Sequence, residues 1–331
     1  MTPPVPRIGI SWGDPGGIGP EVICKALPAL MQSFEASYIV YASVSLMEAA
    51  LSAAKRLPVP SPFLEEEESR PGFFISPLQF EEKVRVGKPA KPNGDISFLS
   101  FSKALEDARD KKIDALVTAP ISKHSWHLAG IPWAGHTDYL QHLYPDAMMT
   151  FWSKNLKVAL LTHHLPLKEA VEAVTRKAVY AFIVKLNENL DRMDFGRRRI
   201  MVAGLNPHAG EEGLLGREEI TAIGPAVKEA RLQGIPVEGP FPPDTVFRMA
   251  RAAPEVFVLG LYHDQGLIAF KGDAFDDGVN ATLGMPFLRT SPDHGTAFDI
   301  AGKDRANPSS MIHSLQLALR FTRRVKSEPP P

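Results

Sequence analysis

The chain has 331 residues, 44% of them hydrophobic and 23% charged, and a formal net charge of -1 at pH 7. This composition leaves room for two globular domains and shows neither the basic excess that favours nucleic acid nor an apolar run of about 20 residues that could span a bilayer. The single cysteine, Cys24, excludes an internal disulfide and a multi-cysteine metal site. The first residues, MTPPVPRIG, also lack the apolar core of a signal peptide, so we expect a cytoplasmic protein. From the charge and the lack of a long apolar run, we expect no nucleic-acid and no membrane partner.

Short β-branched runs alternate with longer helical patterns along the chain. Strands are predicted over residues 7–11, 37–42, 113–119, 158–163, 199–205 and 255–262. Helices are predicted over residues 20–31, 99–110, 168–190, 217–232 and 309–322. This alternation predicts an α/β fold with a mostly parallel sheet covered on both faces. Ligands of such sheets bind at the carboxyl ends of the strands.

The first strand runs into a glycine-rich turn, GDPGGIGPEV, which has the layout of a dinucleotide-binding loop. The G-x-G-x-x-G fingerprint fails, because its second and third glycines are replaced by Pro15 and Ile18. The second strand also ends in Ala42 and Ser43, where an acidic residue should bind the ribose, and no Gly-Lys-Ser/Thr of a P-loop follows. We therefore interpret this loop as a tight turn before a helix that starts near Pro20, not as a Rossmann cofactor loop; Asp14 stays a candidate for a role near the active site.

Histidines follow three of the predicted strands at the points where these strands end. The motifs LLTHHLPL, AGLNPHAGEEG and GLYHDQG carry them: His163 and His164, His208, and His263. Taken singly, each histidine is more often a hydrogen-bonded loop or core residue than a ligand. Three neutral imidazoles from neighbouring strand ends are nevertheless the donors of a catalytic divalent-metal site with an open position. Zn²⁺ fits such donors, and Co²⁺, Mn²⁺ and Mg²⁺ stay open.

Two further groups suit an anionic substrate. WAGHTDYL places His136 and Thr137 at a helix start, where a phosphate or carboxylate can bind, although Thr137 could instead be the N-cap. Behind His263 the chain carries Lys271, Asn280 and Arg289, a combination of cations and an amide that fits the same ligand class. Singly, these two cations would more often be surface charges.

Several motifs together resemble the family of 4-hydroxythreonine-4-phosphate dehydrogenase of the vitamin B6 pathway. They are GDPGGIGPE, TAPISK, GHT, HLPL, LNPHAGE, GREE, YHDQGL and NATLGMPF with the RTS and DHGTAFDIAGK segments that follow, and they extend from about residue 7 to about residue 320. The resemblance implies the two-lobed α/β/α fold of the isocitrate and isopropylmalate dehydrogenases, which is not a Rossmann fold. It also implies an NAD or NADP site on other loops, with the adenosine near His294, Gly295 and Asn307.

The resemblance assigns roles to the residues singled out above. It implies a divalent metal (Zn, Mg or Co) on His164, His208 and His263, where His164 is preferred over His163 because it directly precedes LPL. It implies substrate contacts from His136, Thr137, Lys271, Asn280 and Arg289. Asp264 and Lys271 are the candidates for moving a proton.

The resemblance also implies an organisation in space. Residues 1–130 with about 300–331 would form one α/β lobe, and residues 131–299 a second lobe with most of the metal and substrate residues. The active site would lie in the cleft and at the interface of a homodimer, in which one subunit lends residues to the other.

The implied reaction is the NAD-dependent oxidation of 4-phosphooxy-L-threonine to 2-amino-3-oxo-4-phosphooxybutanoate, which loses CO2 to give 3-amino-2-oxopropyl phosphate. The nearest alternative is a sister dehydrogenase for D-threonate or D-erythronate 4-phosphate or a related hydroxy acid, and three departures from the family pattern keep it open: Leu214, Asp138 and the acidic stretch FKGDAFDDGVN. A metal-dependent hydrolase would leave the DHGTAFDIAGK segment unexplained. A silent sugar-phosphate-binding protein would be expected to lack at least one implied ligand.

Overall fold

The computed structural model describes residues 5–54, 61–62, 70–80, 83–193, 195–196, 198–251, 253 and 255–326. The chain divides into two compact units, Met1–Met148 with Val279–Pro331, and Met149–Gly278. The boundaries thus lie near residues 148 and 278, whereas the sequence placed them near 130 and 299. The physical reason is strand pairing: Leu288–Pro292 forms a strand that pairs with Ala115–Thr118, so this part of the chain completes the sheet of the first unit.

The first unit contains a mostly parallel sheet. Its strand order is β3-β4-β2-β1-β5-β12-β11, and β11 is antiparallel to β12 while the other neighbours run parallel. The strand bounds are β1 Arg7–Ser11, β2 Ser37–Ala42, β3 Ser61–Pro62, β4 Gly72–Pro77, β5 Ala115–Thr118, β11 Val279–Leu283 and β12 Leu288–Pro292. The central strands β2 and β5 are buried at every position, as expected of strands covered on both faces.

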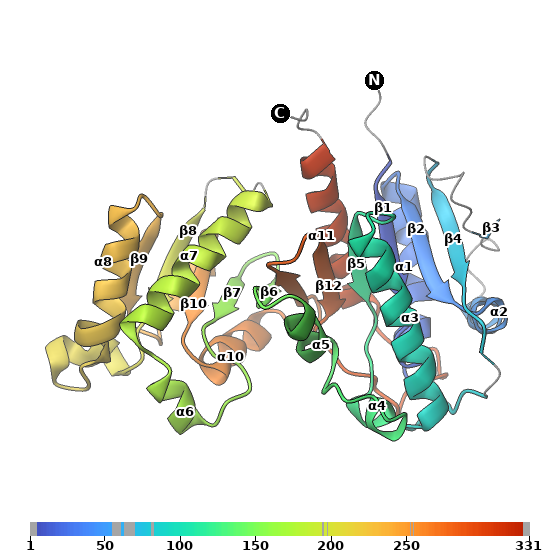
Figure 1. The fold of residues 1–331 in the computed structure, drawn as a ribbon, viewed down its shortest axis with the longest axis horizontal. Helices are drawn as coiled ribbons and strands as arrows, with labels where there is room; N and C mark the ends of the chain where they lie inside the picture. The colour runs from blue at the N-terminus through green and yellow to red at the C-terminus, as the bar shows by residue number, and fades with distance from the viewer. Residues whose placement is uncertain are drawn as a thin grey trace. The chain divides into compact units, whose positions relative to one another are not determined.

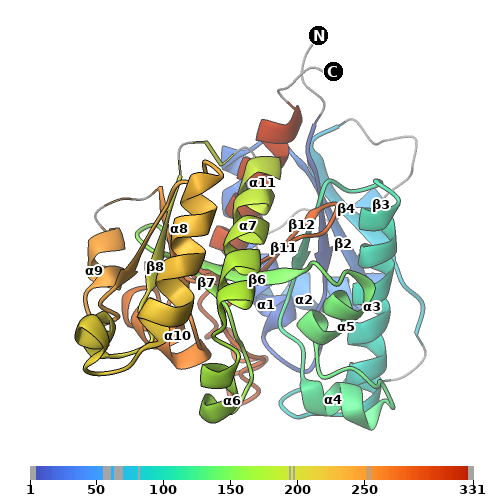
Figure 2. The ribbon, with the colours of Figure 1, turned by 60° about the vertical axis from the view of Figure 1, so that its left-hand side comes forward.

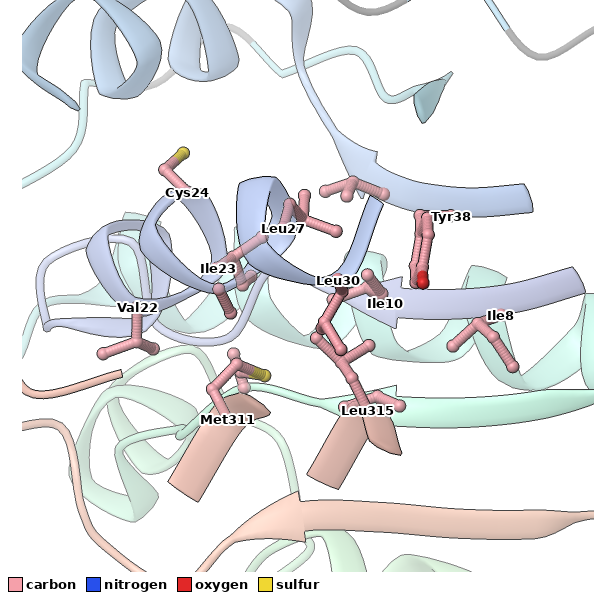
Figure 3. Packing of buried hydrophobic residues seen from close by; sticks show 14 of the residues in the cluster. Ile8, Ile10, Val22, Ile23, Cys24, Leu27, Leu30, Tyr38, Met311 and Leu315 are labelled. Carbon is pink, nitrogen blue, oxygen red and sulfur yellow. The ribbon is translucent and has the colours of Figure 1, made fainter. Parts of the chain in front are cut away.

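Helices cover both faces of this sheet. Their bounds are α1 Gly19–Ser33, α2 Val44–Ala54, α3 Lys91–Arg109, α4 Lys123–Leu128, α5 His136–Leu143 and α11 Ser309–Lys326 (Figure 1). On one face, α1 and α11 form an apolar cluster with β1, and Figure 3 shows Met311 and Leu315 of α11 reaching toward Val22 and Leu30 of α1. On the other face, α3 packs through Phe101 and its neighbours. The first unit is therefore an α/β/α sandwich.

The second unit has the same type of architecture, with mostly parallel strands between helices. The strand order is β6-β7-β10-β8-β9, with β6 antiparallel to β7 and the other neighbours parallel. The strand bounds are β6 Met148–Trp152, β7 Lys157–Leu160, β8 Arg199–Ala203, β9 Val237–Phe241 and β10 Val256–Gly260. The helical segments are α6 Leu167–Glu172, α7 Arg176–Arg192, η2 Pro207–Gly213, η3 Glu219–Ile223, α8 Gly224–Leu232, α9 Val246–Arg251 and α10 His263–Asp273.

Two helical layers enclose this second sheet. Helices α9 and α10 pack on it through a cluster that includes Phe247, Leu267 and Phe270. Helices α7 and α8 lie side by side in both ribbon views (Figures 1 and 2) and bury their own apolar faces. The carboxyl ends of β7, β8 and β10 all point to one edge, since these strands are parallel neighbours.

The predicted α/β class with a mostly parallel sheet is confirmed. Strands 7–11 and 37–42 are found with the predicted bounds. The helix predicted over 168–190 is two helices. α6 ends at Glu172, and the extended Thr175 caps α7 by accepting a hydrogen bond from the Ala178 amide. No helix among the described residues combines the length and the apolarity required to cross a membrane.

Candidate functional site

A buried guanidinium lies at the centre of the first unit's candidate site. Arg289 on β12 is 3% exposed. Its Nε and Nη2 both donate to Thr118 Oγ1, at 3.0 and 2.6 Å, and its Nη1 donates to Thr282 Oγ1 at 3.3 Å. Register explains these contacts, because Thr282 on β11 pairs directly with Arg289 and Thr118 ends the neighbouring strand β5.

The third partner of this guanidinium is an imidazole whose tautomer can be assigned. Arg289 Nη2 lies 3.0 Å from Nδ1 of His136, and a guanidinium can only donate, so Nδ1 accepts and the proton sits on Nε2. Burial, reinforced by the nearby positive charge of Arg289, holds the pKa of His136 well below its usual value. The His136 Nε2–H group is buried and has no hydrogen-bond partner among the described residues. It is therefore a donor that lacks an acceptor.

We call these four residues, Arg289, His136, Thr118 and Thr282, the Arg289 cluster. The charge balance of this cluster indicates an anion site. Burial lowers the pKa of Arg289 to about 9, so the guanidinium is still charged at neutral pH. All its partners in the described part of the chain are neutral. A buried cation without a counter-charge costs several kcal/mol of folding free energy, and a carboxylate or phosphate would offset that cost.

The other predicted substrate residues of the first unit lie on the same elements. Thr137 follows His136 on α5 and is half-buried; the N-cap position is taken by Gly135, so the interpretation of Thr137 as the N-cap is wrong. Asn280 lies on β11, two residues before Thr282, and pairs in register with Ser291. The sequence thus identified Arg289 and His136 but missed Thr118 and Thr282, for which the only signal is a hydroxyl residue at or next to the end of each strand.

In the second unit, the three histidine-bearing loops follow three adjacent parallel strands. His163 and His164 follow β7, His263 follows β10 and His208 follows β8, and β10 pairs with both of the others. Side-chain hydrogen bonds tie these strand ends together. Thr162 Oγ1 donates to the Leu261 carbonyl at 2.9 Å, and Gln265 Nε2 donates to the Gly204 carbonyl at 2.7 Å.

Two of the predicted metal ligands lie close together. The ring centroids of His164 and His263 are 5.4 Å apart. His263 Nδ1 lies 2.7 Å from Asp264 Oδ1. With an ionised carboxylate as its partner, Nδ1 donates, which leaves the lone pair of Nε2 for a ligand; this is the arrangement that metal-binding histidines usually have. Asp264 therefore orients the imidazole of His263, whereas the sequence had suggested it only as a candidate for moving a proton.

His163 belongs to the same group. Burial, and to a smaller extent the nearby His164 and His263, lowers the pKa of His163 to about 4. Its Nδ1 is buried without a hydrogen-bond partner in the described part of the chain. Thus three imidazoles gather at this edge of the second sheet.

His208 lies on an unusual turn. The backbone from His208 to Glu212 is left-handed at five consecutive residues, with φ of 53°, 53°, 83°, 44° and 55°. Only Gly210 tolerates this conformation freely, and each other residue costs roughly 1 to 2 kcal/mol. His208 is exposed on this turn, and no group of three or more His, Cys, Asp or Glu side chains in the described chain is arranged to hold a metal ion. The donor types fit a divalent metal; the structure pairs His164 with His263 and leaves His208 on the neighbouring loop.

The remaining predicted residue of the second unit is Lys271. It lies in the last turn of α10, the helix that begins at His263, and it is exposed. Asp264 lies in the first turn of the same helix.

The segment predicted to hold the adenosine follows β12 and is fixed to α1. His294 is half-buried, and Gly295 and Asn307 are exposed. Glu21 Oε1 accepts from the Ala306 amide at 2.6 Å and from Lys25 Nζ at 2.8 Å, and Lys25 also forms an ion pair with Asp304. The GDPGGIGPE motif therefore holds this segment through its final glutamate, which sequence reasoning did not single out.

The same motif contains a buried carboxylate. Asp14 is fully buried, and its two oxygens accept from the Gly16 amide at 2.8 Å and from Ser125 Oγ at 2.6 Å. Burial raises its pKa, and these hydrogen bonds partly oppose that effect. Because both of its carboxylate oxygens accept these hydrogen bonds, Asp14 is explained as a residue that stabilises the turn.

Comparison with known proteins assigns the family. Residues 35–318 match the family model described as pyridoxal phosphate biosynthetic protein PdxA. The chain belongs to this family. It is 42% identical over 315 residues to the 4-hydroxythreonine-4-phosphate dehydrogenase of Aquifex aeolicus, covering 94% of this chain and 97% of the relative. It is 38% identical over 322 residues to the D-threonate 4-phosphate dehydrogenase of Pectobacterium atrosepticum, covering 95% and 98%.

A solved structure agrees with this assignment. The 4-hydroxythreonine-4-phosphate dehydrogenase of Klebsiella pneumoniae superposes with a TM-score of 0.84 at 37% identity, covering 96% of this chain and 99% of that one. The predicted family is therefore confirmed, and the relatives named here are dehydrogenases.

Proposed function

We propose that this PdxA-family chain is an NAD- or NADP-dependent dehydrogenase that oxidises 4-phosphooxy-L-threonine to 2-amino-3-oxo-4-phosphooxybutanoate, which then loses CO2 to give 3-amino-2-oxopropyl phosphate. The observation that carries the proposal is the Arg289 cluster, a buried cation with only neutral partners, on a chain whose relatives are dehydrogenases of phosphorylated hydroxy acids. A buried cation of this kind favours the binding of an anion, because the negative charge of the substrate offsets the free-energy cost of burying the guanidinium.

The residues of the Arg289 cluster would bind the anionic end of the substrate. The guanidinium supplies charge, and the His136 Nε2–H group supplies a hydrogen bond whose geometry is set by Arg289 on the other ring nitrogen. Thr137, Asn280 and Lys271 are the further proposed substrate contacts.

His164, His208 and His263 would hold one divalent metal ion, Zn²⁺, Mg²⁺ or Co²⁺. The ion supplies Lewis acidity for the hydroxyl group that is oxidised. Asp264 keeps the proton of His263 on Nδ1, and either Asp264 or Lys271 moves the proton in the reaction. The common edge shared by the three strand ends supports this donor set.

The segment around His294, Gly295 and Asn307 would hold the adenosine of the cofactor. If so, the Glu21 contacts set the cofactor affinity. The substitution Glu21→Gln weakens the bonds to the Ala306 amide and to Lys25, and we expect the Kd of NADH to rise about tenfold, which corresponds to about 1.4 kcal/mol. Calorimetric titration with NADH measures this change.

The control for Glu21→Gln is Asp95→Asn, which neutralises the acid of an exposed i,i+4 ion pair with Lys91. Asp95→Asn should leave the Kd of NADH unchanged, and neither variant should alter the KM of the phosphorylated substrate by more than about twofold. An unchanged Kd in Glu21→Gln would remove this segment from the cofactor site.

The alternative substrate is D-threonate 4-phosphate or D-erythronate 4-phosphate. The relative from Pectobacterium atrosepticum, 38% identical, supports it, since that protein is named for the first of these compounds. The test is NADH formation with each phosphorylated substrate in turn, with and without a divalent metal. A preference of at least tenfold in kcat/KM for 4-phosphooxy-L-threonine supports the main proposal, the reverse preference supports the alternative, and a metal-dependent reaction without NADH formation would contradict both.

We also propose a homodimer with a shared active site. Each of the three histidine-bearing segments of the second unit exposes large apolar side chains: Leu165 and Leu167, Leu214 and Leu215, and Ile268 and Phe275. Exposed apolar groups clustered by segment are typical of an interface. Phe275→Glu should shift the sedimentation coefficient from that of a dimer to that of a monomer and lower turnover with it; a wild-type chain that sediments as a monomer while active would refute the proposal.

A further inference from the structure

The GREE motif, Gly216–Glu219, is the one motif of the family resemblance to which no role has yet been assigned. Its second glutamate, Glu219, is 5% exposed at the start of the π-helical turn η3. A buried carboxylate needs compensating partners, because an unpaired buried charge is strongly destabilising.

Within the described residues, every hydrogen-bond partner of the Glu219 side chain belongs to the segment that leads to His208. Glu219 Oε1 accepts from the backbone amides of Leu205 and Asn206, at 2.7 and 2.8 Å. Its Oε2 accepts from Asn206 Nδ2 at 2.9 Å, and the neighbouring Glu218 accepts from the same nitrogen at 2.7 Å. In the described part of the chain, Glu219 has no cationic partner, so its charge is used to fix this one segment.

Glycines allow the carboxylate to lie this close to the backbone. A Cβ at Gly210 would lie 2.7 Å from Glu219 Oε2, and a Cβ at Gly204 would lie 3.1 Å from Oε1. A Cβ at Gly216 would lie 2.2 Å from Asn206 Nδ2. The LNPHAGE and GREE motifs are thus closely packed against each other.

The contact between Glu219 and the segment before His208 controls the left-handed backbone conformation of residues 208–212, which the sequence itself does not favour. The left-handed run begins at His208, two residues after Asn206, and three of the other four residues in it are Ala or Glu rather than Gly. L-residues leave this conformation unless their surroundings hold it. Glu219 supplies three hydrogen bonds at the entry to the run and packs against Gly210 inside it.

We propose that Glu219 is a positioning residue that holds the left-handed turn and thereby sets the direction from which the His208 imidazole reaches the divalent metal. This inference rests on the proposed role of His208 as a metal ligand. The turn itself is independent of that role, so the two can be tested separately.

The main test uses Glu219→Leu, which removes both acceptor oxygens, and with them all three hydrogen bonds, while keeping similar bulk. In the metal-free protein we expect the amides of Leu205 and Asn206 to exchange hydrogen at least about tenfold faster, because they lose their acceptor. We expect the Kd of Co²⁺, followed by its visible absorption, to rise about 10- to 100-fold, the range seen when groups that orient metal ligands are removed.

A second variant covers the case in which Glu219→Leu does not fold. Asn206→Asp places a third carboxylate against Glu218 and Glu219 and should give the same two changes through charge repulsion. Glu219→Gln retains one oxygen for the two backbone amides and should be affected less than Glu219→Leu. Glu229→Gln, at an exposed carboxylate of α8 that pairs with Arg176, is the matched control and should behave as wild type.

The outcomes separate the inference from the proposed function. Wild-type exchange rates and Co²⁺ affinity in both Glu219→Leu and Asn206→Asp would overturn the inference, whatever the role of His208. Faster exchange with unchanged Co²⁺ affinity would also overturn it, provided that His208→Ala weakens Co²⁺ binding. If His208→Ala binds Co²⁺ as tightly as wild type, the metal site in the proposed function is wrong.

Discussion

Replacement of His208 by alanine is expected to lower turnover by more than about a thousandfold, which is about 4 kcal/mol in the activation barrier. In the proposed metal site, the substitution would remove one of three imidazole donors, and the site would lose the Lewis acidity that the ion would supply for oxidation of the hydroxyl group. The fold should change little, because the side chain is exposed on a loop and a catalytic ion contributes little to the stability of a chain this long. Turnover of 4-phosphooxy-L-threonine at saturating NAD measures the effect, and circular dichroism checks the fold.

The matched control for His208→Ala is His124→Ala, which removes an exposed histidine from the first unit and should retain wild-type turnover. Near-normal turnover of His208→Ala in buffer containing a chelator would contradict the metal role of this residue. A loss of turnover in both variants would point to a general effect of the substitution.

Replacement of Arg289 by methionine is expected to have opposite effects on binding and on stability. The KM of the phosphorylated substrate should rise at least about 100-fold, since the guanidinium is the buried positive charge of the Arg289 cluster, while the KM of NAD should change less than about threefold. The protein should become more stable, because burial of a cation among neutral groups costs free energy that an apolar side chain of similar length does not. Steady-state kinetics and urea denaturation measure the two effects.

Arg109→Met is the control for this second prediction, because Arg109 is an exposed cation that pairs with its neighbour Asp110. It should leave both Michaelis constants and the stability nearly unchanged. Equal rises in the two Michaelis constants of Arg289→Met would remove Arg289 from the substrate site. A large loss of stability would show that the guanidinium is a structural group and not an anion-binding one.

Much of the architecture could be read from local patterns. The strands at 7–11 and 37–42 are short runs rich in β-branched and aromatic residues, and their length and composition favour buried strands over helices. Polar residues directly after such strands gave the histidine-bearing loops, because a strand end is where a parallel sheet presents side chains to ligands. His136 came from a predicted helix start, and Arg289 from the cation-rich stretch behind His263. Local sequence was also sufficient for the family, whose motifs span most of the chain.

Local patterns failed where partners are distant in the sequence. Nothing near residue 288 indicates that β12 pairs with β5, some 170 residues earlier, so the boundary predicted near residue 299 differs from the division of the structure near residue 278. For the same reason the hydroxyl of Thr118 could not be assigned to Arg289. Helix α6 was merged with α7, because the break between them, residues 173–175, is short and lies inside a continuous helical pattern.

The sequence by itself determined the α/β class, the family and the types of donor available to a metal and to an anion, since these depend on residue identity and periodicity. Tertiary structure alone decided that Arg289 is buried without a counter-charge among the described residues, that His136 carries its proton on Nε2, and that Glu219 accepts hydrogen bonds from the segment before His208. The physical reason is that burial, tautomer and backbone strain are properties of the surroundings. Those surroundings are assembled from residues that lie far apart along the chain.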